Sequence, residues 1–290
     1  MRRRLKNALV HWIARGLVSV LGRLPLALGL PLGRALGALG FRVAARERAI
    51  ASAQLSRALG IAPSSPRLRA LSRGVFAHLG TSAVEVCRAL RDPGALGGVV
   101  FTDATRRALD EALAEGRGAV LATGHIGNWE LLAAALARGG FPLTAVVKAS
   151  YDPGITRSIE RARGRLGVET VHRSGAGTAA AMLRALRRGR ILGLLIDQDT
   201  RASGGFVPFF GEPAFTPTGA AAIALRTGAP LLVGAIRRTP RGGHVVEIER
   251  CAPFADPLAG TAALTAVLER AIRRHPSQWV WFHERWRTRP

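Results

Sequence analysis

The stretch LATGHIGNWELL, residues 121–132, contains two side chains that could move a proton, His125 and Glu130. It joins an apolar run typical of a strand to an apolar run typical of a helix. An imidazole with a pKa of about 6.5 can take a proton from an alcohol at neutral pH. A carboxylate on the other ring nitrogen fixes the tautomer and stabilises the imidazolium. We therefore interpret His125 as a candidate general base and Glu130 as its candidate partner.

The spacing of this pair predicts where each residue lies. A separation of five residues turns about 140° around a helix, so two such side chains on one helix would not face each other. We expect His125 in the turn after the strand and Glu130 in the first turn of the helix, where the helix dipole favours a carboxylate. Asn128 is the expected N-cap and also a candidate substrate-binding residue. The motif holds no serine or cysteine nucleophile, so a substrate hydroxyl would attack directly.

Other interpretations of the pair remain open at this point. The two residues could form a helix cap, or they could activate water in a hydrolase. One histidine and one glutamate are too few ligands for a metal, and no second cluster in the sequence supplies the rest. We expect neither a metal nor a cofactor.

Alternating strand and helix patterns over residues 99–290 predict an α/β fold with a mixed, mostly parallel sheet flanked by helices. The expected strands are 118–123, 143–148, 168–171, 191–196, 231–236 and 244–249, and the last two are expected to form a hairpin across RRTPRGG. The expected helices lie near 127–138, 154–165, 177–188, 217–227 and 260–274.

Further polar and apolar side chains follow the predicted strand 191–196. Asp197 and Asp199 would emerge at the carboxyl edge of the sheet, where they could hold His125 or an arginine, or bind sugar hydroxyls. Phe206 and Phe209 belong to an apolar strip that could line an acyl-chain channel or pack in the core. In TPTG, residues 216–219, Thr216 is a candidate N-cap with Pro217 at the first helical position. This helix start, in which Thr218 is also a candidate binding residue, could receive a phosphate or could be an ordinary cap.

The composition is strongly basic, with 42 Lys and Arg against 19 Asp and Glu and a net charge of +23. Such a charge attracts anionic lipids, acidic proteins or nucleic acids. A GC-rich genome could account for the preference for arginine over lysine, but not for the shortage of acids. The arginines are scattered and only one tyrosine is present, which disfavours a nucleic-acid binder. Cys87 and Cys251 form no metal or disulfide pattern.

The N-terminal residues 1–42 predict a helical segment that associates with a membrane. Arg4, Arg15 and Arg23 fall on one arc of a helix, which suits a helix lying in the bilayer interface. Arginines interrupt each candidate spanning window, and Pro25 and Pro31 are expected to break any long helix. Residues 43–98 predict a separate helical part before the α/β domain of residues 99–290.

Four ordered blocks resemble the bacterial lipid A biosynthesis acyltransferases, the late lauroyl and myristoyl branch of the lysophospholipid acyltransferase superfamily. HIGNWE resembles the HX4(D/E) block of that superfamily. The three others are RGRLGVETVHRSG (163–175), LIDQDTRASGGFVPFFGEPAFTPTG (195–219) and QWVWFHERWRTRP (278–290). By its position in the second block, Arg163 matches the family's arginine, which would contact anionic substrate groups.

The resemblance implies a glycerolipid acyltransferase-like fold and a reaction in which a lipid A hydroxyl attacks an acyl thioester, with His125 as base and Glu130 as partner. The implied donor is acyl carrier protein or acyl-CoA, and both are anionic. The alternative acceptor is another glycolipid such as a phosphatidylinositol mannoside. The implied location is the cytoplasmic face of the cell inner membrane, with which the MRRRLK start agrees. No nucleic acid is expected as a partner.

Overall fold

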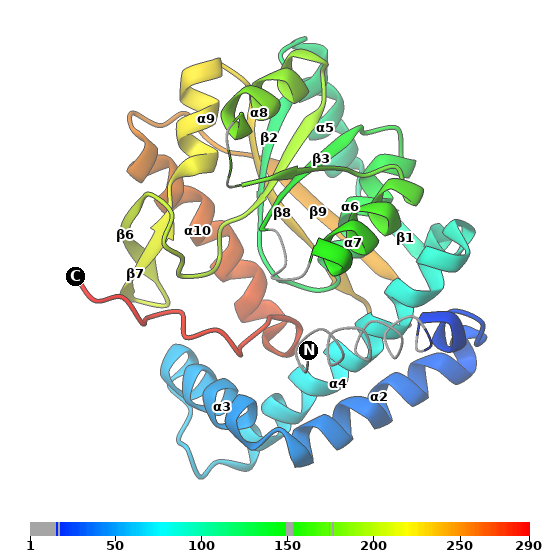
Figure 1. Cartoon of the computed structure of the whole chain (residues 1–290). Coiled ribbons are helices and arrows are strands. Elements are labelled where there is room, and N and C mark those ends of the chain that lie inside the picture. The colour runs from blue at the N-terminus through cyan, green and yellow to red at the C-terminus, as the bar shows by residue number, and fades with distance from the viewer. Residues whose placement is uncertain (1–15, 17, 149–152, 174, 176) are drawn as a thin grey trace.

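The computed structural model describes residues 16, 18–148, 153–173, 175 and 177–290. Within these residues seven strands form one sheet in the order β1-β9-β8-β2-β5-β3-β4. Neighbouring strands run parallel except β8 and β9, which form an antiparallel hairpin. This confirms the predicted mixed, mostly parallel sheet and its final hairpin. Helices cover both faces of the sheet, and α2, α3 and α4 lie together along one side of it (Figure 1).

The bounds of the elements agree with the expected ranges to within a few residues. The strands are β1 Val99–Phe101, β2 Ala119–Thr123, β3 Leu143–Val147, β4 Glu169–His172, β5 Ile191–Leu195, β6 Gly204–Phe209, β7 Glu212–Pro217, β8 Leu231–Arg238 and β9 His244–Arg250. The α-helices are α2 Leu26–Val43, α3 Ala45–Leu59, α4 Pro66–Arg91, α5 Asp103–Ala114, α6 Trp129–Arg138, α7 Pro153–Arg165, α8 Thr178–Arg187, α9 Gly219–Thr227 and α10 Pro257–Arg274. Two 3-10 helices are η1 Pro93–Gly98 and η2 Pro276–Gln278.

Strand β2 is buried along its whole length because helices cover both faces of the sheet. Successive side chains of a strand point to opposite faces. Leu121 accordingly packs in a cluster with Leu109 of α5 and Leu132 of α6. Val120 packs in the other cluster, which includes residues of α8, α9 and α10. The strand therefore runs through the middle of the core, and its carboxyl end is rigidly placed.

The small hairpin of β6 and β7 was not predicted from the sequence. Thr216 pairs with Gly205 in this hairpin, is fully buried, and accepts a hydrogen bond from the guanidinium of Arg285. The expected N-cap at Thr216 is therefore wrong, because strand pairing extends through it. The N-cap position of α9 is Thr218, whose side chain makes no capping hydrogen bond. Strand β1 and helix α5 were also not predicted.

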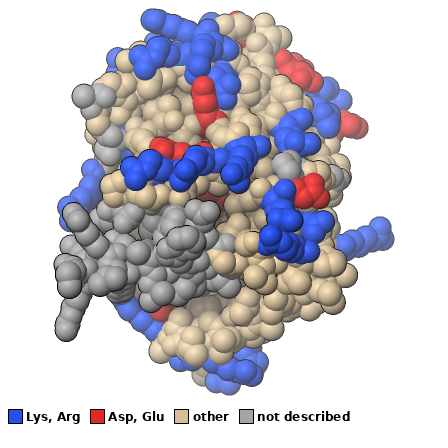
Figure 2. Space-filling model, turned by 45° about the vertical axis from the view of Figure 1, so that its right-hand side comes forward, with Lys and Arg blue, Asp and Glu red and all other residues tan. Residues whose placement is uncertain are grey.

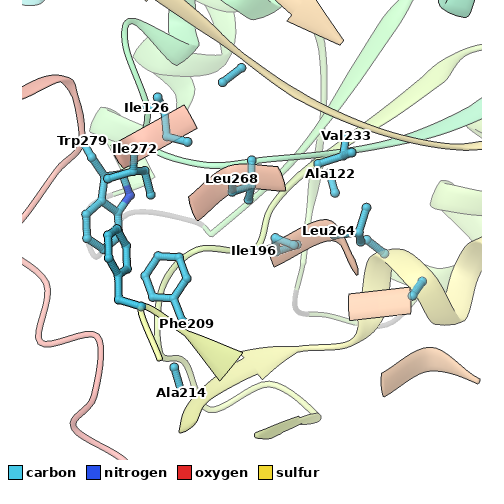
Figure 3. Packing of buried hydrophobic residues seen from close by; sticks show 14 of the residues in the cluster. Ala122, Ile126, Ile196, Phe209, Ala214, Val233, Leu264, Leu268, Ile272 and Trp279 are labelled. Carbon is cyan, nitrogen blue, oxygen red and sulfur yellow. The ribbon is translucent and has the colours of Figure 1, made fainter. Parts of the chain in front are cut away.

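The aromatic residues after β5 and at the C-terminus pack together in the core. Phe209 lies beside Trp279, with ring centroids 5.6 Å apart, and is 1% exposed (Figure 3). Phe206 is half-buried against Phe215, with centroids 5.6 Å apart. Of the two alternatives for the strip, the structure shows core packing for Phe209. Trp279, Trp281 and Trp286 are buried too, so these rings do not lie at a membrane interface.

Lys and Arg are the prevailing charged residues on the face of the molecule drawn in Figure 2, in agreement with the composition. On the face drawn in Figure 2, Lys and Arg side chains form several separate groups, and Asp and Glu side chains are few. This scattered distribution differs from the single basic band expected of a nucleic-acid binder.

Helix α2 corrects the prediction for the N-terminal segment. Pro31 lies inside this 18-residue helix rather than ending it. By length and composition α2 could cross a membrane, and only 17% of it is buried. Arg4 and Arg15 lie outside the described residues, so the arginine arc that they form with Arg23 stays a prediction. The proposed boundaries after residues 42 and 98 also stay predictions, although one core cluster contains both Leu55 of α3 and Val120 of β2.

Close glycine contacts explain how α2 remains helical in spite of Pro31. A Cβ added at Gly33 would lie 2.7 Å from the Gly80 carbonyl oxygen of α4, and one at Gly37 would lie 2.7 Å from the Ala77 Cα. The two backbones therefore approach one another at van der Waals distance. Dispersion contacts along this interface offset the hydrogen bond that Pro31 cannot donate.

We expect Gly37→Ala to lower the free energy of unfolding by about 1–3 kcal/mol, because the added methyl group would force α2 away from α4. Denaturant unfolding followed by circular dichroism measures this change. Gly164→Ala is the matched control, since a Cβ there meets nothing within 4 Å. Equal stability of Gly37→Ala and the control would contradict the close packing of α2 on α4.

Candidate active site

The predicted turn between strand and helix is present. Strand β2 ends at Thr123 and α6 begins at Trp129, so His125 lies in the connecting turn. The Asn128 side chain caps α6 by accepting a hydrogen bond from the Leu131 amide at 3.4 Å. Glu130 lies in the first turn of α6. These placements confirm the local geometry that was predicted from spacing.

Three hydrogen bonds from distant segments fix the backbone of this turn. The Gly127 amide donates to the Gln278 carbonyl at 2.7 Å, and the Val280 amide donates to the His125 carbonyl at 3.2 Å. The Gly127 carbonyl accepts from His78 Nε2 of α4 at 3.0 Å. Burial lowers the pKa of His78 to about 4, so its ring is neutral at physiological pH. The turn is thus held from both the C-terminal segment and α4.

The carboxylate hydrogen-bonded to His125 is Asp197, not Glu130. Asp197 Oδ1 accepts from His125 Nδ1 at 2.8 Å, and Oδ2 accepts from the His125 amide at 2.6 Å. This corrects the expected His125–Glu130 pair and agrees with the alternative that Asp197 holds the histidine. Trp129 packs its ring edge-on against the imidazole, with centroids 4.9 Å apart. Nδ1 is therefore occupied, and Nε2 is the ring nitrogen left for a substrate.

Asp197 is a buried carboxylate that accepts three N–H groups. Besides His125, the indole Nε1 of Trp279 donates to it at 2.7 Å. Burial alone would raise the pKa of Asp197, but the charge and hydrogen bonds of His125 and the Trp279 hydrogen bond outweigh burial and lower it. Burial likewise opposes the charged form of His125, yet the Asp197 charge and hydrogen bond, aided by the Glu130 charge, raise the His125 pKa above its usual value.

Glu130 is instead paired with Arg163 of α7. Arg163 Nε donates to one Glu130 oxygen at 3.0 Å and Nη2 donates to the other at 2.6 Å. This two-point geometry fixes the guanidinium plane. Arg163 is therefore placed at the candidate site, and Arg173 of the same block also lines the groove there. Arg161 bonds only within α7, to the Arg157 carbonyl at 3.3 Å.

A groove with a volume of about 1070 Å³ opens at the carboxyl ends of β2, β3, β4 and β5. His125 and Arg163 both line it. Its apolar lining includes Trp129, Val146, Ile159, Met182, Leu194, Ile196, Ala220 and Ile223, and its cationic lining includes Lys148, Arg173, Arg201 and Arg287. The groove lining therefore combines apolar side chains with several cations and with the acids Glu160 and Asp199.

The other predicted binding residues divide between this groove and the core. Asp199 lines the groove and accepts hydrogen bonds from the Thr288 amide at 2.8 Å and from Arg287 at 3.3 Å. Asn128 is buried and donates to the Ser82 carbonyl at 3.1 Å, so it supports the turn rather than the groove. Thr216, Thr218, Phe206 and Phe209 are not among the groove residues.

Two positioning residues were not predicted from the sequence. Trp279 holds Asp197, and Gly124 leaves room for it, since a Cβ at that glycine would lie 3.0 Å from the carboxylate carbon. In the sequence, the C-terminal block QWVWFHERWRTRP, which contains Trp279, indicated function only through its resemblance to the acyltransferase family. Among the described residues, no group of three or more His, Cys, Asp and Glu could hold a metal ion.

The family to which the chain belongs follows from its sequence profile. The profile of the bacterial lipid A biosynthesis acyltransferases matches residues 1–288. The chain belongs to this family. The match includes the turn with His125, the two acids considered as its partner, Glu130 and Asp197, and the C-terminal segment that holds Asp197.

Relatives with curated functions lie in two groups of this acyltransferase family. A phosphatidylinositol mannoside acyltransferase of Mycobacterium tuberculosis is 33% identical over 181 residues, which are 61% of this chain and 57% of that protein. The match thus spans little more than half of the mycobacterial relative. The lipid A biosynthesis palmitoleoyltransferase of Escherichia coli is 26% identical over 288 residues, 96% of this chain and 91% of that protein.

We expect Gly127→Ala to lower the free energy of unfolding by about 3 kcal/mol and to displace His125. Gly127 has a φ of +61°, and an added Cβ would overlap the Ile236 carbonyl oxygen. Gly116→Ala is the control, because Gly116 has a φ of +72° but open space around it. Thermal unfolding compares the two variants. Equal losses would mean that backbone strain alone, and not the tight fit at Ile236, sets the cost.

Proposed function

We propose that this chain transfers an acyl group from a thioester to a hydroxyl of a glycolipid, with His125 as the general base. The observation that carries the proposal is the His125–Asp197 pair at a groove lined by both apolar and cationic side chains. Apolar lining residues suit a fatty chain, and cationic ones suit an anionic donor or a phosphorylated acceptor.

The chemistry follows from the tautomer that Asp197 imposes. With Nδ1–H donated to Asp197, Nε2 carries the lone pair and accepts the proton of the acceptor hydroxyl. The hydroxyl oxygen attacks the thioester carbonyl carbon and forms a tetrahedral intermediate. The carbon–sulfur bond then breaks, and the imidazolium returns its proton to the departing thiolate. The products are an ester and a free thiol. Asp197 stabilises the imidazolium between the two proton transfers.

Arg163 is proposed to bind anionic substrate groups. Glu130 engages its Nε and Nη2, which fixes the guanidinium plane and leaves Nη1 for a ligand. In this proposal Glu130 is a positioning residue for Arg163 and contributes to His125 through its charge. The bidentate pair explains how a carboxylate in the HX4(D/E) block can contribute without touching the imidazole.

The relatives suggest the substrate class but leave two acceptors. A lipid A precursor agrees with the family profile and with the Escherichia coli relatives, whereas a phosphatidylinositol mannoside agrees with the mycobacterial relatives. Acyl carrier protein and acyl-CoA are both anionic donors, which the net charge of +23 favours. A thioester hydrolase is the rival reaction. We favour transfer because the groove is large enough for an acyl chain and a second apolar ligand.

We propose that the chain works at the cytoplasmic surface of the inner membrane, with α2 in contact with lipid. The outer face of α2 exposes Leu28, Leu32, Leu36, Leu39 and Val43, which we call the leucine face. Exposed apolar side chains in one contiguous stripe mark an interaction surface, and a bilayer accepts them without a partner protein.

The first prediction for this activity concerns His125→Ala and Asp197→Asn. With lauroyl acyl carrier protein or lauroyl-CoA and either glycolipid acceptor, we expect each variant to lose about a hundredfold or more in kcat/KM. In the wild type, kcat/KM should fall as the pH drops through the raised pKa of His125, because the base must be neutral. Asp197→Asn should move this acid limb to lower pH, since it removes the charge that raises the pKa.

Glu130→Gln is the matched control for the pH profile, and it should shift the acid limb by less, because the Glu130 charge contributes less to the His125 pKa than Asp197 does. Donor consumption measured with and without acceptor separates transfer from hydrolysis. Donor consumption at the same rate with and without acceptor would contradict acyl transfer. If Asp197→Asn left the acid limb of kcat/KM at the wild-type pH, the result would contradict the assigned His125–Asp197 pair.

The second prediction concerns the leucine face. Leu32→Ser/Leu36→Ser/Leu39→Ser should bind phospholipid vesicles at least about tenfold more weakly, since each leucine that enters a bilayer contributes about 1 kcal/mol. Vesicle flotation measures the bound fraction. The control replaces the exposed leucines 183, 225 and 258 of helices α8, α9 and α10 in the same way. Equal binding by the two triple variants would argue against α2 as the membrane contact.

A further inference from the structure

The groove contains a second histidine–carboxylate pair, which the proposed proton transfer does not use. His172 is the last residue of β4, Glu160 lies on α7, and both line the groove. His172 Nε2 donates to Glu160 Oε1 at 2.5 Å. The two side chains are 33% and 36% exposed, so a ligand in the groove can reach them. The pair is therefore oriented by its own contact and open to the groove.

Glu160 keeps one carboxylate oxygen for a ligand. His172 occupies Oε1, while Oε2 has no hydrogen bond within the described part of the chain. Asp199, the other acid of the described groove lining, has both oxygens engaged, because Oδ1 accepts from Arg287 and Oδ2 accepts from the Thr288 amide. Glu160 is thus the acid that can accept a further hydrogen bond from a molecule in the groove.

One face of α7 lines the groove. Its groove residues, spaced as i, i+3, i+4 and i+7, are Thr156, Ile159, Glu160 and Arg163. At a separation of three residues, the Cβ atoms of Glu160 and Arg163 are neighbours, about 5–6 Å apart. These opposite charges each have another partner, since Arg163 pairs with Glu130 and Glu160 pairs with His172. A cation and an acid are therefore held side by side on one wall of the groove.

A cation beside a carboxylate suits a ligand that carries a phosphate close to hydroxyl groups. Phosphate oxygens accept hydrogen bonds from a guanidinium, whereas an ionised carboxylate accepts them and repels phosphate. A hydroxyl group can donate to Glu160, and a fatty chain offers no donor at all. The pair of charges on α7 thus favours a phosphorylated sugar over an acyl chain on this wall.

The position of this wall agrees with a headgroup rather than a fatty chain. In the sheet order, three strand-to-strand steps separate β4 from β2, which places their ends roughly 14 Å apart. A headgroup of more than one sugar ring spans such a distance, so one hydroxyl can reach His125 while another reaches Glu160. Met182 of α8 and Ile223 of α9 supply apolar lining from the core cluster on the other face of the sheet from α6, and this side suits the fatty chain.

We propose that Glu160 binds a sugar hydroxyl of a phosphorylated glycolipid acceptor, and that His172 is the positioning residue that holds the Glu160 carboxylate. The proposal rests on the proposed function, because it assigns the acceptor headgroup to a wall of the same groove. In this arrangement Arg163 binds the phosphate and Glu160 selects for a hydroxyl beside it.

The first test measures the KM of the acceptor and the KM of the donor separately for Glu160→Gln. With the glycolipid acceptor that the wild type uses, we expect the acceptor KM to rise about tenfold, because the hydrogen bond to a charged acceptor is lost. The change should appear in the acceptor KM rather than in kcat or the donor KM. Glu111→Gln is the matched control, since Glu111 of α5 is exposed and does not line the groove.

Two results of this measurement would overturn the proposal. An acceptor KM that Glu160→Gln leaves equal to that of Glu111→Gln would mean that Glu160 does not contact the acceptor. A rise in the donor KM alone would place the donor, and not the sugar headgroup, at Glu160. Unfolding midpoints verify that the variants are folded.

The role of His172 is tested with a double-mutant cycle. His172→Ala should raise the acceptor KM by itself, but it should add nothing to Glu160→Gln, because the two residues act through one contact. His172→Gln should restore most of the affinity, since its amide group can also donate to Glu160. Additive effects of His172→Ala and Glu160→Gln, or no rescue by His172→Gln, would contradict the positioning role.

A binding measurement separates this site from the proposed reaction. In the His125→Ala background, glycolipid binding is followed by tryptophan fluorescence, because Trp129 lines the groove. Adding Glu160→Gln should weaken this binding about tenfold, for the same reason as in the KM measurement. If the wild type transferred no acyl group but this difference remained, the proposed reaction would fail and the site would stand. Equal binding by the two proteins, with transfer intact in the wild type, would overturn the site alone.

Discussion

The buried carboxylate of Asp197 is the interaction on which the candidate site depends. An ionised carboxylate with almost no exposure is costly unless N–H groups satisfy it, and here two groups of His125 and the indole of Trp279 do so. Each hydrogen-bond donor comes from a segment that has to be in position before it can reach Asp197. The turn after β2 supplies His125, and the chain after η2 supplies Trp279. The same hydrogen bonds that stabilise the charge therefore also fix the histidine tautomer and the C-terminal segment.

Much of the fold was predictable because it depends on local patterns. The six expected strands, five expected helices, the final hairpin and the Asn128 cap follow from apolar periodicity and turn residues. The partner of His125 was not predictable in this way, because Asp197 lies 72 residues away in sequence. The register of the sheet supplies the missing information: Thr123 of β2 pairs with Leu195 of β5, so the residues two positions beyond each strand end meet. Sequence proximity favoured Glu130, whereas strand pairing selected Asp197.

Two other corrections have the same physical origin, because tertiary contacts outweigh local preferences. Pro31 is a helix breaker by propensity, yet α2 continues through it because its glycines pack on α4. Thr216 and Pro217 read as a helix start by composition, yet strand pairing with β6 and the guanidinium of Arg285 hold Thr216 in β7. A single sequence shows the preference but not the partner that overrides it.

Helix α4 connects the proposed membrane side of the molecule to the candidate site. One of its faces packs on the glycines of α2, and another carries His78 and Glu85 toward the turn that holds His125. Glu85 accepts from Asn128 at 3.0 Å and also pairs with Arg238 of β8.

Removing one member of such a buried network leaves the others unpaired, so α4 cannot shift along its axis without a large cost. The distance and angle between the leucine face and His125 are therefore set by one rigid helix. Under the proposed function, a lipid acceptor that enters from the bilayer would meet the groove in a fixed orientation, and this orientation would limit which of its hydroxyls can reach Nε2.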